Sequence, residues 1–183
     1  MSNTALLLID IQNDYFSDGK WPLVDQEKAA YQAVRLLKHF RDNNLSVFHV
    51  RHLSDNTEAP FFAKGTSGSE IHKTVLPLKE EQIFIKSEIN CFKDTDLLQA
   101  LREQNISKLV IVGSMSHMCI DAATRAASDY GFDCTVAKDA CATLDLEFDG
   151  NITPAAQVHN AFMSGLAFAY AKVISTDEAI SRT

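Results

Sequence analysis

The chain has 183 residues, a length typical of one compact domain, and 46% of them are apolar. Charged residues make up 22% and the net charge is −7, an ordinary globular composition that argues against a disordered, collagen-like or coiled-coil chain. An acidic chain without long runs of one charge sign also argues against nucleic-acid binding. We therefore expect a single domain over residues 1–183 that binds no nucleic acid.

The start of the chain carries no targeting or membrane signal. Its longest apolar stretch, residues 5–9, is interrupted by Asp10, whereas a membrane-spanning helix needs about 20 apolar residues. The four cysteines, at positions 91, 119, 134 and 141, form no C-x-x-C pair, and free thiols are typical of a reducing compartment. We expect a cytoplasmic protein without membrane contact, in which most of the four thiols pack in the core.

Short aliphatic runs alternate with longer segments of helical period, which indicates βα units and a parallel sheet. Gly113 is expected to end the fourth strand. Residues 51–80 have no sustained period, and a stretch this long in a compact domain is typical of a lid or a binding loop. The expected strands cover 4–9, 45–50, 83–86, 109–112, 134–137 and 172–175, and the expected helices cover 25–43, a segment capped by Asp94 or Thr95, 117–130 and 153–168.

Three reactive side chains come at or soon after predicted strand ends. Asp10 follows the first strand, Lys86 closes the third, and Cys119 lies six residues beyond Gly113. In open parallel sheets, ligands bind outside the carboxyl ends of the strands, so the three side chains converge if these strands are close together. Each has an ordinary alternative, namely a turn cap for Asp10, a solvated lysine for Lys86 and a buried packing residue for Cys119.

Cys119 follows an apolar strand and a turn of small residues, which predicts that its thiol lies in the first turn of a helix. The helix dipole and the free N–H groups there favour thiolate over thiol, and they can stabilise an oxyanion. A partly desolvated carboxylate at Asp10 suits acceptance of the thiol proton, and Lys86 adds positive potential. Together the three residues predict a nucleophilic cysteine site.

Four segments, in the same order along the chain, resemble the cysteine-hydrolase superfamily that includes isochorismatase, nicotinamidase and N-carbamoylsarcosine amidase. The resemblance extends over nearly the whole chain, and its first and third segments are the most specific. The segments are LLLIDIQNDYF at 6–16, KSEINCF at 86–92, VGSMSHMCIDAATRA at 112–126 and DACAT at 139–143.

This resemblance implies an α/β fold, a Rossmann-like three-layer α-β-α sandwich around a central six-stranded parallel sheet. It implies a catalytic triad of Asp10, Lys86 and Cys119. It also implies a cis peptide bond before the nucleophile, between Ser114 and Met115. The N–H groups of Met115 and Cys119 are then expected to form the oxyanion hole.

The implied reaction is hydrolysis of a C–N bond in a small-molecule amide, carbamoyl or ureido compound. Asp10 takes the thiol proton, Cys119 attacks the carbonyl carbon, and water hydrolyses the resulting thioester. Two alternatives stay open: ether hydrolysis of the isochorismatase type, which needs no thiol, and a non-catalytic binding module on the same fold. The presence of Cys119 favours C–N hydrolysis.

The chain departs from the nicotinamidase pattern after the second strand. Nicotinamidases carry a metal-binding Asp-x-His there, whereas this chain reads VRHLSD at 50–55. We therefore expect His49 and His52 to be ordinary core or surface histidines, with no metal and no other cofactor. The candidates for substrate binding are Phe16, Trp21, Phe62, Asn90 and His117.

Two further expectations follow from the resemblance. The segment GTSGSEIH at 65–72 is similar to amidase-like members, including streptothricin-hydrolase-like proteins, and supports an amide substrate. Members of the superfamily are commonly dimers or tetramers, so we expect a homodimer or homotetramer. The apolar side chains expected at its interface are Phe162, Leu166, Phe168 and Tyr170.

Overall fold

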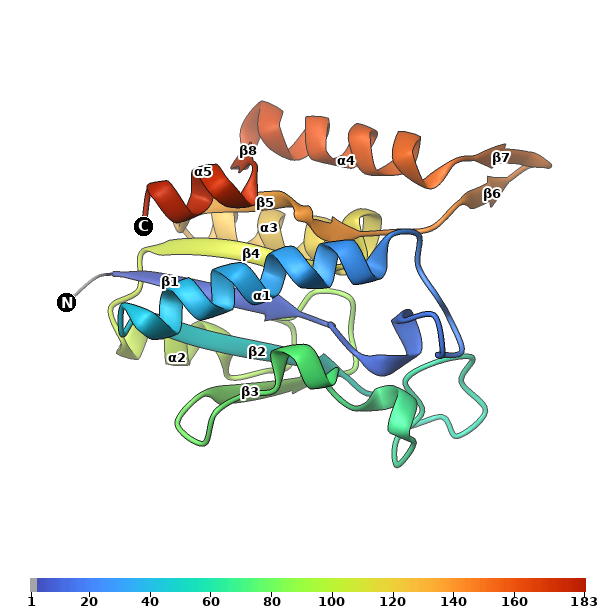
Figure 1. The fold of residues 1–183 in the computed structure, drawn as a ribbon, viewed down its shortest axis with the longest axis horizontal. Coiled ribbons are helices and arrows are strands. Elements are labelled where there is room, and N and C mark those ends of the chain that lie inside the picture. Colours follow the sequence, from blue (N-terminus) through green and yellow to red (C-terminus); the bar gives the residue numbers. More distant parts are fainter. Residues whose placement is uncertain (1–2) are drawn as a thin grey trace.

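In the computed structural model, which describes residues 3–183, the fold is built on one sheet of six parallel strands (Figure 1). The strand order is β3-β2-β1-β4-β5-β8. The predicted α/β class with a central six-stranded parallel sheet is thus confirmed. The strands are β1 (Thr4–Ile9), β2 (Ser46–His52), β3 (Gln82–Lys86), β4 (Lys108–Ser114), β5 (Asp133–Ala142) and β8 (Ala171–Ile174).

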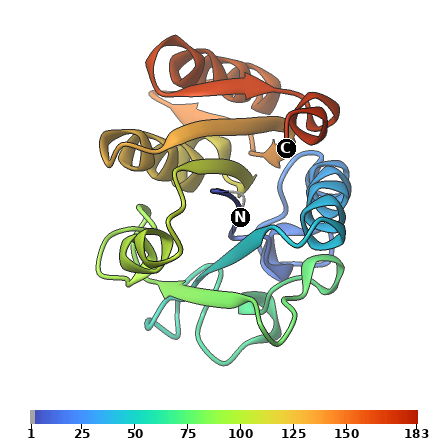
Figure 2. The same cartoon turned by 90° about the vertical axis from the view of Figure 1, so that its left-hand side faces the viewer.

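Helices cover both faces of the sheet and complete three layers (Figure 2). Successive side chains of a strand point to opposite faces, so Leu6 and Leu8 of β1 pack with α1, whereas Leu7 and Ile9 pack in the cluster on the other face. α5 lies on the α1 face. The helices are α1 (Gln26–Asp42), α2 (Leu97–Glu103), α3 (Asp121–Asp129), α4 (Ala155–Ala169) and α5 (Thr176–Ser181).

β4 extends two residues beyond its predicted end and contains Gly113. The backbone of Gly113 has φ 127°, and a Cβ there would lie 1.9 Å from the carbonyl oxygen of Ile9 in β1. The prediction that Gly113 ends the strand is therefore wrong. Gly113 instead allows β1 and β4 to approach each other at their carboxyl ends. This close approach places the segment after β4 beside Asp10.

Several elements differ from the sequence-based expectation. β5 continues beyond its predicted end at residue 137 to Ala142, so Cys141 lies in this strand. α2 begins at Leu97, and its N-cap position is occupied by Asp96 and not by Asp94 or Thr95, although Thr95 Oγ1 accepts a hydrogen bond from the Leu97 N–H at 3.5 Å. The antiparallel hairpin of β6 (Leu146–Phe148) and β7 (Asn151–Thr153) was not predicted, nor was α5. Figure 1 shows this hairpin extending away from the body before α4 begins.

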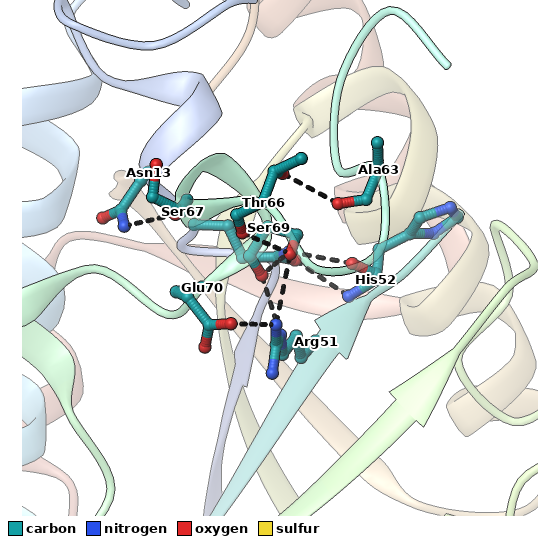
Figure 3. Close-up of polar contacts among 9 residues, drawn as sticks. Asn13, Arg51, His52, Ala63, Thr66, Ser67, Ser69 and Glu70 are labelled. Atoms are coloured by element: carbon teal, nitrogen blue, oxygen red, sulfur yellow. Dashed lines mark hydrogen bonds and ion pairs between the residues drawn. The ribbon is translucent and has the colours of Figure 1, made fainter. Parts of the chain in front are cut away.

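The long segment between β2 and β3 has only two short 3-10 turns, Ser67–Ser69 and Lys73–Val75. Side chains from the body of the fold nevertheless hold its 66–70 turn (Figure 3). Arg51 donates to the Ser69 carbonyl oxygen at 2.7 Å and to Glu70 Oε1 at 2.7 Å, and Asn13 Nδ2 donates to the Ser67 carbonyl oxygen at 2.7 Å. These hydrogen bonds hold the 66–70 turn against the body of the fold.

Candidate active site

Asp10, Lys86 and Cys119 meet at the carboxyl ends of the strands. Lys86 Nζ lies 2.8 Å from Asp10 Oδ2 and 3.2 Å from Cys119 Sγ. Both charged side chains of the ion pair are fully withdrawn from solvent, and Cys119 is 3% exposed. β2 lies between β1 and β3 in the sheet, so the long lysine side chain has to reach past β2 to make these contacts. The three residues singled out by sequence thus lie together.

Asp10 is the first residue after β1 and takes a left-handed backbone conformation with φ 53°. Its N–H still donates to the Val50 carbonyl oxygen of β2 at 3.0 Å, so the chain turns only after the sheet pairing is complete. Among the described residues, Asp10 Oδ1 has no hydrogen-bond partner. A buried carboxylate oxygen without a donor is expensive, and this one is free to accept a proton or a donor from a bound molecule.

Lys86 ends β3 and is surrounded by acceptors. Besides Asp10 and Cys119, its Nζ contacts His52 Nδ1 at 3.1 Å and the Glu88 carbonyl oxygen at 3.1 Å. Burial alone would lower the pKa of Lys86, but the charges of Asp10 and Cys119 outweigh burial and raise it above its ordinary value. Lys86 is therefore a stable ammonium ion at neutral pH.

Cys119 lies in a short π-helical turn, Ser116–Ile120, that leads into α3. Burial, reinforced by the charge of Asp10, raises the pKa of the Cys119 thiol, and Lys86 offsets only part of this. The expected preference for thiolate at a helix start is thus outweighed by burial. The resting group is a thiol, which needs a base at the moment of reaction.

The turn before Cys119 is held from two sides. The Ser114–Met115 peptide bond is cis, and Ser114 Oγ donates to Gln26 Oε1 of α1 at 2.8 Å. Ser116 Oγ donates to the Ala142 carbonyl oxygen at 3.2 Å. Within residues 3–183, the Met115 N–H donates to no backbone carbonyl group, which leaves it available for an oxyanion.

Known proteins resemble this chain in sequence and in fold. The Isochorismatase domain family matches residues 4–178 of the chain. The chain belongs to the isochorismatase family. A crystal structure of a putative isochorismatase hydrolase from Oleispira antarctica is 57% identical, with a TM-score of 0.96 over 99% of this chain and 98% of that one.

Two curated relatives of this isochorismatase-family hydrolase extend the comparison. An uncharacterized isochorismatase family protein from Bacillus subtilis, YddQ, is 49% identical over 95% of this chain and 97% of its own. Streptothricin hydrolase from Streptomyces noursei is 31% identical over 78% of this chain and 55% of its own. The protein is therefore a hydrolase of this family, with a relative whose name specifies a substrate.

The three carbocyclic and indole side chains among the predicted substrate-binding residues lie in two places. Phe62 is buried, with its ring centroid 6.0 Å from that of His52, and Trp21 lies beside this aromatic cluster, 5.1 Å from the Phe61 ring. Phe16 instead stacks on His72 at 3.6 Å and faces a hollow of about 540 Å³. The lining of that hollow includes none of the three triad residues, so Phe16 belongs to a different part of the surface.

Asn90 and His117 make contacts that position neighbouring loops. Asn90 Oδ1 accepts a hydrogen bond from the Phe92 N–H at 3.0 Å, which closes a local turn. His117 Nδ1 lies 2.6 Å from Thr143 Oγ1, and its ring packs edge-on against Phe162 of α4. These contacts account for both side chains without a ligand.

Three residues near the triad were not predicted from sequence as site residues. Tyr15 is buried, and burial, followed by the charges of Asp10 and Cys119, raises its pKa. The His52 ring contacts Lys86. The Gln12 side chain donates to the backbone carbonyl oxygen of His52. His52 lies directly opposite Lys86 in the register of β2 and β3, a pairing that no local sequence pattern contains.

Residues 3–183 contain neither a candidate metal cluster nor a candidate membrane span. In residues 3–183, no three His, Cys, Asp or Glu side chains gather as a group that could hold a metal ion. His49 is buried and pairs with Glu81 at 2.9 Å. No helix of the same range is both long and apolar enough to cross a bilayer. Of the other cysteines, Cys91, Cys134 and Cys141 lie buried in the core.

Proposed function

We propose that this protein hydrolyses a C–N bond of a small-molecule amide, carbamoyl or ureido compound through a thioester on Cys119. The observation that carries the proposal is the position of Lys86 Nζ, 2.8 Å from Asp10 Oδ2 and 3.2 Å from Cys119 Sγ. One ammonium group thus contacts both a buried carboxylate and a buried thiol. This arrangement suits a proton transfer from sulfur to carboxylate.

The reaction begins when Asp10 accepts the thiol proton and Cys119 Sγ attacks the carbonyl carbon. The negative charge on the carbonyl oxygen is stabilised by the N–H groups of Met115 and Cys119. The tetrahedral intermediate collapses as protonated Asp10 gives its proton to the departing amine or ammonia. A water molecule, deprotonated by Asp10, then hydrolyses the thioester and releases the acid and the free thiol.

Lys86 acts throughout as a fixed positive charge. The pKa of Lys86 is raised because Asp10 and Cys119 outweigh the effect of burial, so it keeps its proton while charge moves from Asp10 to sulfur. An ammonium beside both groups stabilises the negative charge wherever it resides. Transfer of a proton between the two buried groups is then possible without a large change in solvation.

A cluster of aromatic and methionine side chains near the triad is evidence for a small, uncharged substrate group. Tyr15 and Phe62 are buried in one cluster with Met115, and Trp21, Phe61 and Met118 pack against it. Apolar and aromatic linings with few polar groups are typical of small-molecule sites. The similarity to streptothricin hydrolase adds support for a C–N substrate over an ether.

The test is a screen of small amides, ureas and carbamates for ammonia or amine release, run in parallel on the wild type and Cys119→Ala. We expect turnover of at least one compound by the wild type, reduced at least about a hundredfold in the variant. Undiminished hydrolysis by Cys119→Ala would contradict a thiol nucleophile. Turnover of vinyl ethers that survives Cys119→Ala but not Asp10→Asn would favour ether hydrolysis instead.

A further inference from the structure

His52 is a titratable side chain that contacts the triad but has no part in the proposed mechanism. It is the last residue of β2, and its Cα partner in β3 is Lys86. Its Nδ1 lies 3.1 Å from Lys86 Nζ. Because an ammonium ion has only donors, this nitrogen must be the acceptor, and the proton of the neutral ring is therefore on Nε2.

Lys86 Nζ has more acceptors around it than it has N–H bonds to donate. The three N–H bonds of the ammonium face four acceptors: Asp10 Oδ2, His52 Nδ1, the Glu88 carbonyl oxygen and Cys119 Sγ. A thiol sulfur is the weakest acceptor of the four. With one N–H on His52 and one on Glu88, a single N–H is left for Asp10 and Cys119.

We propose that His52 is a positioning residue: its neutral ring, through Nδ1, holds the Lys86 ammonium so that one N–H is shared by Asp10 and Cys119. The inference rests on the proposed function, in which the negative charge moves from Asp10 to the sulfur. A shared N–H can follow that charge without rotation of the ammonium group. His52 contacts no reacting atom and acts only through Lys86.

The fold fixes His52 in two ways. Gln12 is fully buried, and its side-chain amide pairs with the His52 backbone, donating to the carbonyl oxygen and accepting from the N–H, both at 2.8 Å. Gln12 Nε2, which donates to the His52 carbonyl oxygen, also donates to the Ser69 carbonyl oxygen at 2.8 Å. Figure 3 shows His52 at the end of β2 beside the turn that contains Ser69. The ring also lies against Phe62.

The surrounding charges keep the His52 ring neutral. Burial first, and then the positive charge of Lys86, lower the pKa of His52, while Asp10 and Glu88 oppose this only in part. The other titratable groups around Lys86 are Cys119 and the buried Cys91. A protonated His52 would place two cations 3.1 Å apart, so only the neutral ring can serve as the acceptor.

The test uses iodoacetamide alkylation of Cys119, followed by peptide mass mapping, because this readout needs no known substrate. His52→Leu removes the acceptor. His52→Asn places Oδ1 where Nδ1 stands and keeps it. We expect alkylation of Cys119 about tenfold slower in His52→Leu, as for the loss of one hydrogen bond to a charged group, and within about threefold of the wild type in His52→Asn. His49→Leu, which removes the other histidine of β2, is the matched control and should leave the rate unchanged.

Rescue separates positioning from a merely structural role. Equal loss in His52→Asn and His52→Leu, or an unchanged or faster rate in folded His52→Leu, would overturn the inference. If His52→Leu does not fold, the comparison of His52→Asn with His52→Gln decides, because Gln moves the acceptor away from the Nδ1 position and should be slow. Failure of the proposed function would look different, since amide turnover would then survive Cys119→Ala whatever the His52 variants do.

Discussion

Lys86 and Asp10 form an ion pair, 2.8 Å between Nζ and Oδ2, from which solvent is fully excluded. Burying two charges costs several kcal/mol per ion, which their mutual attraction offsets only with good geometry. A pair of this kind adds little to stability compared with apolar residues of the same size. Its placement against Cys119 is instead what the proposed reaction requires.

Asp10→Asn should therefore reduce both stability and reactivity. The variant leaves the Lys86 ammonium buried without its counter-ion, so we expect a loss of about 3 kcal/mol in the free energy of unfolding. Removal of the base should also slow alkylation of Cys119 at neutral pH by about a hundredfold. Urea denaturation and timed labelling measure the two effects.

The double variant Asp10→Asn with Lys86→Met is the control. Because it removes both charges, it should be destabilised by less than the sum of the two single variants. Additive losses would show that the two charges do not interact in the folded protein.

Gln12→Met tests how much the hydrogen bonds of the Gln12 side chain to the His52 and Ser69 backbone contribute to stability. Methionine is close in size but leaves the His52 N–H, the His52 carbonyl and the Ser69 carbonyl without the partner that Gln12 provides. Unpaired buried groups cost about 1–3 kcal/mol each, so a loss of about 3 kcal/mol is expected in urea denaturation. A loss below about 1 kcal/mol would mean that the backbone of His52 is held by other contacts.

Gly113→Ala should prevent correct folding. Its Cβ would lie 1.9 Å from the Ile9 carbonyl oxygen, and its φ of 127° is strained for any side chain. Gly131→Ala is the matched control, because Gly131 also has a positive φ but no atom lies within 4 Å of its Cβ position. We expect a loss of about 1 kcal/mol for Gly131→Ala and insoluble protein for Gly113→Ala. Similar thermal midpoints for the two variants would contradict the close approach of β1 and β4.

Glu81 should contribute to the acid sensitivity of the fold. Burial opposes its ionisation, but hydrogen bonds from Arg41, the Leu78 N–H and His49 lower the pKa of Glu81 from 4.5 to about 2. An acid whose pKa is lower in the folded state stabilises the protein above its unfolded pKa, and that stability is lost as the pH falls from about 4.5 to about 2.

The comparison of the wild type with Glu81→Gln by urea denaturation at pH 7, 5, 4 and 3 isolates this contribution. The difference in unfolding free energy should shrink toward pH 3. Glu80→Gln, an exposed neighbour, should show no such change. A difference that stays constant with pH would contradict the assignment.

We further propose that the protein forms a homodimer or homotetramer. The expected interface needs one correction, because Leu166 of α4 is fully buried within the chain, whereas Phe168 is 93% exposed. Phe148 and Ile152 on the β6–β7 hairpin are also largely exposed, and large apolar side chains in the open are typical of interaction sites. Light scattering should give a dimer or tetramer, with Phe148→Ser or Phe168→Ser shifting the mass downward. A monomeric wild type would contradict the proposal.

The sheet and the triad could be predicted from sequence because their signals are local. The aliphatic run of β1 and the segment around Cys119 each carry their pattern within about ten residues. The β6–β7 hairpin could not be predicted, since its strands have only three residues each, too few to show a period. Gly113 was misread because its role depends on Ile9, a contact between distant parts of the chain.

The contacts of His52 and Gln12 depend on register and on long-range pairing, which no local pattern contains. His52 faces Lys86 from 34 positions away, and Gln12 reaches Ser69 from 57 positions away. The preference for thiolate that was expected from the place of Cys119 at a helix start is likewise opposed by burial, which raises the pKa of its thiol and depends on the whole core.

In the proposed reaction Cys119 carries the acyl group during turnover. The most direct measurement is acid quenching of the enzyme during steady-state hydrolysis of an amide identified by the screen, followed by peptide mapping. We predict the mass of the acyl group on the peptide that contains Cys119, removed by hydroxylamine as expected for a thioester. Steady turnover that persists in Cys119→Ala, with no acyl group on that peptide in the wild type, would contradict the account.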